Sequence, residues 1–221
     1  LLTEEGIAKL KINGARFSDV QVVSDGVVIT VASKDKTTRT MHVTRDATAE
    51  LAQSIMGLSA RRLGPDGPVA VGRLYGDKPR SDGGLEVHHV GQAPRKVQTV
   101  RGVRALAVGD IDGDGHDDLA FADGWHFRYA RQGEAKLAVL PGPDFKAPIR
   151  IGQISDSYTI DALEIVQPGQ ILAVGSTSIV MFVKTAMGWE QRPIGERGTT
   201  GIPTLWESRT GWFGGATSKW V

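Results

Sequence analysis

The strongest candidate for chemistry in the sequence is the acidic stretch 110–118, which reads Asp-Ile-Asp-Gly-Asp-Gly-His-Asp-Asp. Alternating carboxylates in a tight, glycine-containing loop converge on one point, and a backbone carbonyl near the histidine adds another oxygen. Calcium takes about six to eight oxygen ligands, and carboxylates packed this closely repel one another without a cation. The spacing therefore predicts a Ca²⁺ site that involves Asp110, Asp112, Asp114, His116 and Asp118, with a solvated, ion-free turn as the alternative.

This loop is not an EF-hand. An EF-hand loop needs a bidentate glutamate at its twelfth position. Counted from Asp110, the twelfth residue is Phe121, which lies in an apolar run. The flanking residues 105–108 and 118–122 are also typical of strands rather than helices.

Three further residues are candidates for binding a ligand: Trp125, His126 and Trp220. Both tryptophans are expected near strand ends or loops, and the histidine follows the first of them directly. A tryptophan in such a place can stack on a sugar or anchor a partner protein, although packing between sheets is the alternative. Trp206 and Trp212 are expected to be packed.

The composition excludes several classes of function. The chain of 221 residues has no cysteine, which removes thiol catalysis, Cys-ligated zinc, iron–sulfur clusters and disulfides. With 26 Lys and Arg against 25 Asp and Glu, and no basic stripe with interleaved aromatics, nucleic-acid binding is not expected. No apolar run is long enough for membrane insertion. No nucleophile elbow, P-loop or dinucleotide motif is present, so the sequence predicts a protein that is not an enzyme.

The elements that must position these residues are short strands joined by turns, because the chain has 28 glycines and 10 prolines, mostly in turn-like clusters. Five short stretches end in a glycine, and each is expected to be the strand that ends a unit: 9–14, 52–57, 97–102, 137–142 and 190–195. Between them a strand–turn–strand pattern recurs at 20–33, 61–72, 105–122, 162–176 and 204–217. A third strand is predicted in each unit, at Thr40–Thr44, Leu85–Val90, Trp125–Ala130, Ile179–Lys184 and Lys219–Val221.

Four strands in about 40–50 residues is the period of a β-propeller blade. The sequence thus predicts an all-β protein with five four-stranded blades in a single domain, 1–221, whose N-terminal strand 7–14 completes the last blade and closes the ring. A β-sandwich, or a larger ring with blades on a missing segment, is the alternative. Two segments fit less well: Ala47–Leu58 also suits a short amphipathic helix, and Pro143–Thr159 is expected to be a long link between blades.

Within this pattern, residues Val108–Ala122 resemble the FG-GAP/VCBS-type repeat of integrin α-subunit propellers and many bacterial secreted proteins. The resemblance rests on strand–DxDGDGxxD–strand and covers one blade, because the corresponding turns of the other blades lack the acidic loop. It implies calcium in the third blade only, where the ion rigidifies the hairpin.

Together these features predict a calcium-binding recognition or adhesion module, lectin-like, with a glycan or protein as its partner. An extracellular or periplasmic location is expected, since calcium is millimolar outside the cell and such sites bind in about the 10⁻⁴–10⁻³ M range. The alternative is a structural subunit of a larger complex in which calcium only stabilises the fold.

Overall fold

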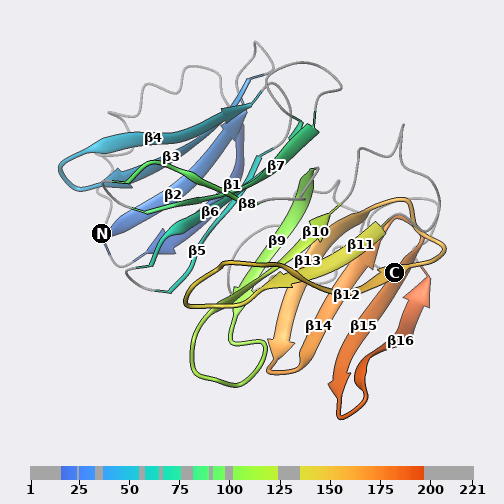
Figure 1. Ribbon diagram of the computed structural model, residues 1–221. Coiled ribbons are helices and arrows are strands. Elements are labelled where there is room, and N and C mark those ends of the chain that lie inside the picture. Colours follow the sequence, from blue (N-terminus) through green and yellow to red (C-terminus); the bar gives the residue numbers. More distant parts are fainter. Residues whose placement is uncertain are drawn as a thin grey trace.

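The structure is a computed structural model, and it describes residues 16–23, 25–32, 37–54, 58–64, 67–75, 82–89, 92–97, 102–123 and 135–196. These residues form sixteen β-strands and contain no helix. The strands pair into four antiparallel sheets of four consecutive strands each (Figure 1). The predicted all-β propeller architecture is confirmed, and we call the four sheets blades 1 to 4.

The first two blades comprise residues 16–97. Blade 1 consists of β1 (Arg16–Val23), β2 (Gly26–Ala32), β3 (Thr38–Thr44) and β4 (Thr48–Ser54). Blade 2 consists of β5 (Leu58–Arg62), β6 (Val69–Tyr75), β7 (Asp82–His88) and β8 (Arg95–Val97).

The other two blades comprise residues 103–196. Blade 3 consists of β9 (Val103–Gly109), β10 (Asp118–Asp123), β11 (Ala135–Leu140) and β12 (Ile149–Ile154). Blade 4 consists of β13 (Ile160–Gln167), β14 (Gln170–Gly175), β15 (Ser178–Thr185) and β16 (Gly188–Glu196).

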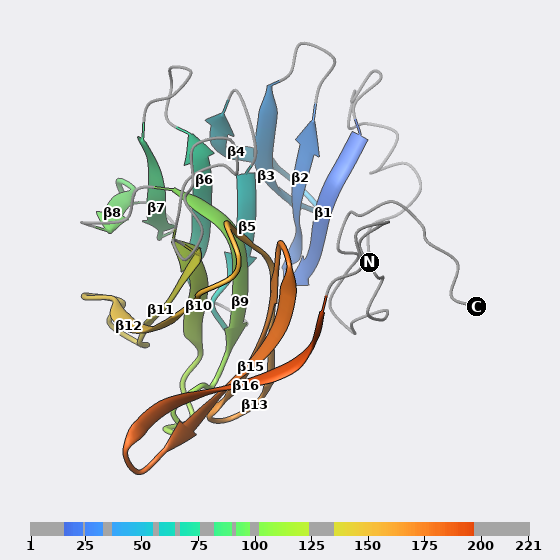
Figure 2. The ribbon, with the colours of Figure 1, turned by 90° about the vertical axis from the view of Figure 1, so that its right-hand side faces the viewer.

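The blades follow one another through their first strands. Strand β9 contacts both β5 and β13, and β5 contacts β1. Each blade then runs outward strand by strand, which Figure 2 shows most plainly for blade 3, where β9, β10, β11 and β12 lie side by side. The second strands β2, β10 and β14 are buried on both faces and contain continuous apolar runs, such as LAFA in β10, whereas the edge strand β12 is largely exposed.

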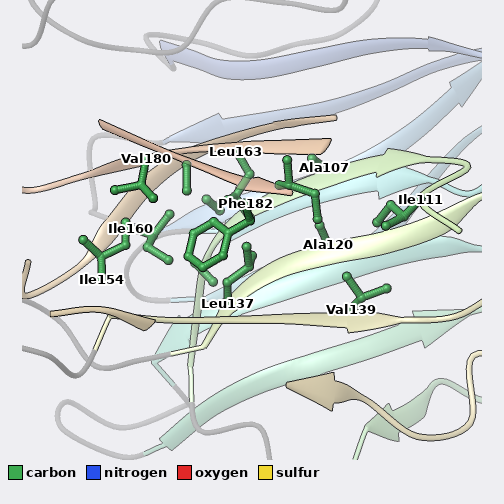
Figure 3. Close-up of a cluster of buried hydrophobic side chains, with 14 residues drawn as sticks. Ala107, Ile111, Ala120, Leu137, Val139, Ile154, Ile160, Leu163, Val180 and Phe182 are labelled. Carbon is green, nitrogen blue, oxygen red and sulfur yellow. The ribbon is translucent and has the colours of Figure 1, made fainter. Parts of the chain in front are cut away.

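The cores lie between successive blades rather than inside one sheet. One buried cluster joins blades 1 and 2, a second joins blades 2 and 3, and a third joins blades 3 and 4. Figure 3 shows the third cluster, in which the fully buried Phe182 of β15 lies among Leu137, Ile160 and Leu163. Because successive strand residues point to opposite faces, blades 2 and 3 each contribute to two of these cores, and blades 1 and 4 each contribute to one.

Blades 1 and 4 each carry a further apolar cluster on the face turned away from these cores. In blade 1 it comprises Val27, Ile29, Val31 and Val43, and in blade 4 it comprises Leu172, Val174 and Ile179. The predicted fifth blade, which includes residues 7–14, 204–217 and Lys219–Val221, lies outside the described residues. Four blades are therefore described, and the number five stays a prediction.

The strand assignment for blade 3 requires a correction. The sequence pattern placed the third strand at Trp125–Ala130, which lies outside the described residues, and the fourth at 137–142. In the structure Ala135–Leu140 pairs directly with β10 and is the third strand of the sheet. The fourth strand, Ile149–Ile154, falls in the segment expected to be a link. It was missed because it is an edge strand with only Ile154 buried, so it carries little apolar periodicity.

The segment Ala47–Leu58 is not a helix. Residues Thr48–Ser54 form the edge strand β4, which pairs antiparallel with β3. Edge strands face the core on one side only, which explains why the segment also fitted an amphipathic helical period.

Candidate functional site

The acidic stretch forms the loop between β9 and β10 of blade 3, and its glycines determine how it turns. Gly113 and Gly115 both adopt a φ of 87°, in the left-handed region. Side-chain-bearing residues rarely adopt this conformation, so glycine at these two positions lets the chain turn twice within the loop. As a result, the carboxylates of Asp110 and Asp114 point toward backbone N–H groups of the same loop.

Asp110 organises the exposed part of the loop. One oxygen of its carboxylate accepts hydrogen bonds from the backbone N–H groups of Gly113, at 2.7 Å, and Asp114, at 3.1 Å. The other oxygen accepts one from Gly115 at 3.0 Å. The carboxylate of Asp114 in turn accepts the backbone N–H of His116 at 2.8 Å. These bonds fix the path of residues 110–116.

Asp118 is the buried end of the loop, with only 1% of its surface exposed. Its Oδ2 accepts the backbone N–H groups of Ile111, at 3.0 Å, and Asp112, at 3.3 Å, while its Oδ1 accepts that of Gly142 at 2.8 Å. Burial raises the pKa of the Asp118 carboxyl above its ordinary value; the neighbouring charge of Asp112 acts in the same direction and the backbone hydrogen bonds oppose it. The position thus holds a carboxylate at a cost that a nearby cation would offset.

Three of the five predicted metal ligands come together. Carboxylate oxygens of Asp110, Asp112 and Asp118 all lie within 4.8 Å of one another, so this cluster could hold a metal ion. Asp114 and His116 belong to the same loop but are not part of the cluster. Every donor in it is a carboxylate oxygen, which suits a hard cation and not a soft one.

The loop is tied to the neighbouring blade. The backbone carbonyl of Ile111 accepts a hydrogen bond of 2.8 Å from the N–H of Gly169, in the β13–β14 turn of blade 4. The side chain of Ile111 is buried in the core between blades 3 and 4. Through Gly142, Asp118 also holds the turn that follows β11. Any ion that orders this loop will therefore act on the junction of two blades.

The predicted ligand-binding residues Trp125, His126 and Trp220 lie outside the described residues, as do Trp206 and Trp212. Trp189, at the start of β16, is described and packs partly buried against the core between blades 3 and 4. For this tryptophan the structure supports the packing interpretation.

A pocket of about 230 Å³ lies on blade 3 and was not predicted. Its lining comprises Phe121 and Asp123 of β10, Lys136, Leu137 and Ala138 of β11, and Pro148 and Arg150 at β12. Sequence reasoning missed it because isolated charges on strands carry no motif. It lies away from the metal cluster, since β10 begins at the acidic loop and ends at Asp123.

The comparisons with known proteins agree with the fold. Residues 102–129 match the FG-GAP repeat family, and this range includes the acidic loop. A search of curated proteins finds no significant match. Among solved structures, the chain is similar to a triple arginine-to-alanine mutant of AofleA from Arthrobotrys oligospora, with a TM-score of 0.54 and 12% identity.

That similarity covers 87% of this chain and 60% of the AofleA chain, so it spans less than two thirds of the length of that chain. At such low identity the likeness concerns the fold alone. Residues 102–129, which include β9, the acidic loop and β10, are therefore similar to an FG-GAP repeat, and the chain as a whole has a β-propeller fold.

Proposed function

We propose that this protein is a calcium-binding β-propeller that acts as a recognition or adhesion module for a glycan or a protein, and that it is not an enzyme. The observation that carries the proposal is the cluster of Asp110, Asp112 and Asp118 within an FG-GAP repeat. The cluster assembles in a rigid loop that is bonded to an adjacent blade. Rigid blades that hold variable loops suit recognition.

Calcium is the ion that the donor set fits best. Three carboxylates supply several of the about six to eight oxygens that Ca²⁺ requires. The carboxylate of Asp114 and the backbone carbonyl of His116 are the next oxygen donors along the same loop. If both also bound the ion, the ligand set would be the one expected from the sequence. When bound, the ion would offset the cost of burying the Asp118 carboxylate and its repulsion with Asp112, which raise the pKa of Asp118 in the absence of the ion.

The role we assign to calcium is structural, and the hydrogen bonds of the loop support it. Ordering residues 110–118 would hold Ile111, and with it the hydrogen bond to Gly169 of blade 4. The ion would thus stiffen the junction between blades 3 and 4 and the surface around it. An extracellular or periplasmic location follows from the millimolar calcium that a modest-affinity site needs. No helix of the described ranges has the length and apolarity to cross a membrane.

Thermal unfolding with and without calcium tests this proposal. A ligand at 100 times its dissociation constant adds about 2.7 kcal/mol to stability, so calcium should raise the Tm of the wild-type protein measurably. Asp112→Ala and Asp114→Ala should abolish this shift and leave most of the fold intact in chelator. Equal melting of the wild-type protein with and without calcium would refute the calcium site.

Recognition is tested separately, by screening a glycan array with calcium and with chelator. A hit that requires calcium would place the binding surface near the ordered loop, and a hit in chelator would place it elsewhere on the blades. A folded protein that binds no glycan and captures no protein partner would refute a recognition module.

The second candidate is a structural subunit of a larger complex. It is favoured by apolar side chains exposed on the first strands of the two end blades: Val22 of β1 is 81% exposed and Val166 of β13 is 48% exposed. The association state of the purified protein would decide between the two candidates. A scaffold subunit would assemble through the strands that carry Val22 and Val166, and Val22→Lys should prevent that assembly.

A further inference from the structure

The pocket on blade 3 combines an apolar floor with a charged rim. Phe121 and Ala138 are buried and form the floor, whereas Asp123, Lys136 and Arg150 bring charge to the rim. Phe121 and Ala138 also belong to the core between blades 2 and 3. The pocket therefore opens on the face of blade 3 that packs against blade 2, with well-packed side chains beneath it.

Among the described residues, neither cation of the rim has an anionic partner. Within the part of the chain that the structure describes, neither Lys136 nor Arg150 makes an ion pair or a hydrogen bond from its side chain. This differs from the arginines elsewhere on the blades, most of which are paired: Arg62 with Asp25, Arg73 with Glu86, and Arg104 with Asp161. Two unpaired cations and one carboxylate give the rim a net positive charge.

The two cations are close in the sheet. Lys136 and Ala138 lie on the same face of β11, and Arg150 is the cross-strand partner of Ala138. Asp123 is the cross-strand partner of Lys136 on the other side. Arg150 thus lies diagonally from Lys136 rather than opposite it. Diagonal neighbours are within reach of long side chains, so an anionic group in the pocket would meet the ammonium and the guanidinium together.

We propose that this pocket binds the anionic group of an acidic sugar, either a carboxylate or a sulfate ester. The guanidinium of Arg150 would donate to its oxygens in a fork, and the ammonium of Lys136 would add a second charge-assisted contact. Asp123 would accept a hydrogen bond from a hydroxyl of the same sugar. Pro148 and the aliphatic stems of the two cations would cover its C–H face.

The size of the pocket limits the ligand. At about 230 Å³ it is smaller than the roughly 300–1,000 Å³ of sites for drug-sized molecules. One sugar residue at the end or side of a chain suits this volume, and a long stretch of polysaccharide does not. This inference rests on the proposed role in recognition and specifies the class of glycan and its place.

Binding of single sugars to the full chain tests the proposal. The probes are glucuronic acid for the carboxylate, N-acetylglucosamine 6-sulfate for the sulfate, and glucose as the neutral control, each titrated in low salt and again at about 0.5 M NaCl. At least one acidic sugar should bind, glucose should not, and salt should weaken binding because the contact is ionic. The acidic sugar that binds identifies the source of the anionic group.

Matched variants locate the site. Arg150→Gln and Lys136→Gln should each weaken binding about tenfold or more, because each removes a charge-assisted contact. Arg192→Gln is the control: Arg192 lies on the exposed strand β16 and pairs with Glu190. It should leave binding unchanged. All three variants should retain the far-UV circular dichroism and the calcium-dependent melting of the wild-type protein.

Three results would overturn the proposal: no binding of either acidic sugar at millimolar concentration, equal binding of glucose, or equal loss in the Arg192→Gln control. These outcomes are separable from failure of the proposed function. A calcium shift together with an array hit that Arg150→Gln leaves unchanged would retain a recognition module and reject this pocket.

Discussion

Asp118 and Asp112 are both expected to contribute to calcium binding, but their contributions to the ion-free fold should differ widely. The buried carboxylate of Asp118 accepts three backbone N–H groups. The single side-chain oxygen of an asparagine could still accept the backbone N–H groups of Ile111 and Asp112. Its NH₂ group would then face the N–H of Gly142, and two donors cannot form a hydrogen bond with each other. Asp118→Asn thus loses at least one hydrogen bond to a charged acceptor, worth about 1.5–3 kcal/mol.

This free energy corresponds to a measurable change in melting temperature. For a chain of about this size, 1 kcal/mol shifts Tm by about 2–4 °C, so the lost hydrogen bond alone would lower Tm by about 3–12 °C in chelator. Asparagine also removes the buried charge and its repulsion with Asp112, which returns part of this loss, so Asp118→Asn should melt below the wild-type protein by less than about 12 °C. Asp112 is exposed and accepts one hydrogen bond, from the backbone of Asp114 at 3.2 Å. Asp112→Asn should therefore change Tm by no more than about 2 °C, as exposed substitutions usually do.

Calcium should separate the two roles further. The wild-type protein should gain about 5–11 °C at saturating calcium, from about 2.7 kcal/mol at 100 times the dissociation constant. Both variants should lose most of this gain. Differential scanning calorimetry in chelator and in calcium gives all the values required. If Asp118→Asn melted with the wild-type protein in chelator, or if Asp112→Asn fell equally far, the hydrogen-bonding argument would be refuted.

Two further predictions concern packing and charge in blade 2. A Cβ at Gly72 of β6 would clash with the side chain of Val103 in β9, so Gly72→Ala should cost about 1–3 kcal/mol and lower Tm by about 2–12 °C. The control is Gly195→Ala, which has open space around the added Cβ and should leave Tm unchanged. Equal Tm values for the two variants would contradict the close approach of the blades. A hydrogen bond from His88 and the charge of nearby cations lower the pKa of the Glu86 carboxyl below its ordinary value of 4.5, so the stability that this carboxylate contributes should be present above pH 4.5 and lost as the pH falls through the lowered pKa. The Tm difference between the wild-type protein and Glu86→Gln, measured from pH 7 to pH 3, should accordingly shrink toward low pH, and a difference independent of pH would argue against this linkage.

Much of the fold could be read from periodicity, because second strands that are buried on both faces leave continuous apolar runs between turn residues. The runs in 27–33, 118–122 and 170–176 correspond to β2, β10 and β14 in the structure. Periodicity failed where burial was one-sided. The exposed edge strand Ile149–Ile154 gave no signal, and the buried strand Ala135–Leu140 was therefore taken for the last of its blade.

The candidate sites likewise differ in how far the local sequence predicts them. The acidic loop is local: its turns and its carboxylates lie within nine residues, so the sequence by itself predicted that they would converge, and the matched FG-GAP repeat agrees. Three of the predicted ligands do come together. What the sequence left open was which carboxylate would be buried and hold the loop.

Only the tertiary structure decided the features that depend on residues far apart in the chain. Asp118 became the buried hub because it meets the N–H of Gly142, 24 residues away. The loop acts on blade 4 because Ile111 meets Gly169 across a blade junction. Lys136 and Arg150 line one pocket because the pairing of β11 with β12 places Arg150 opposite Ala138, two residues from Lys136. Composition and spacing fix local turns and strand periods, whereas register and the packing of blade on blade determine which distant side chains share a site.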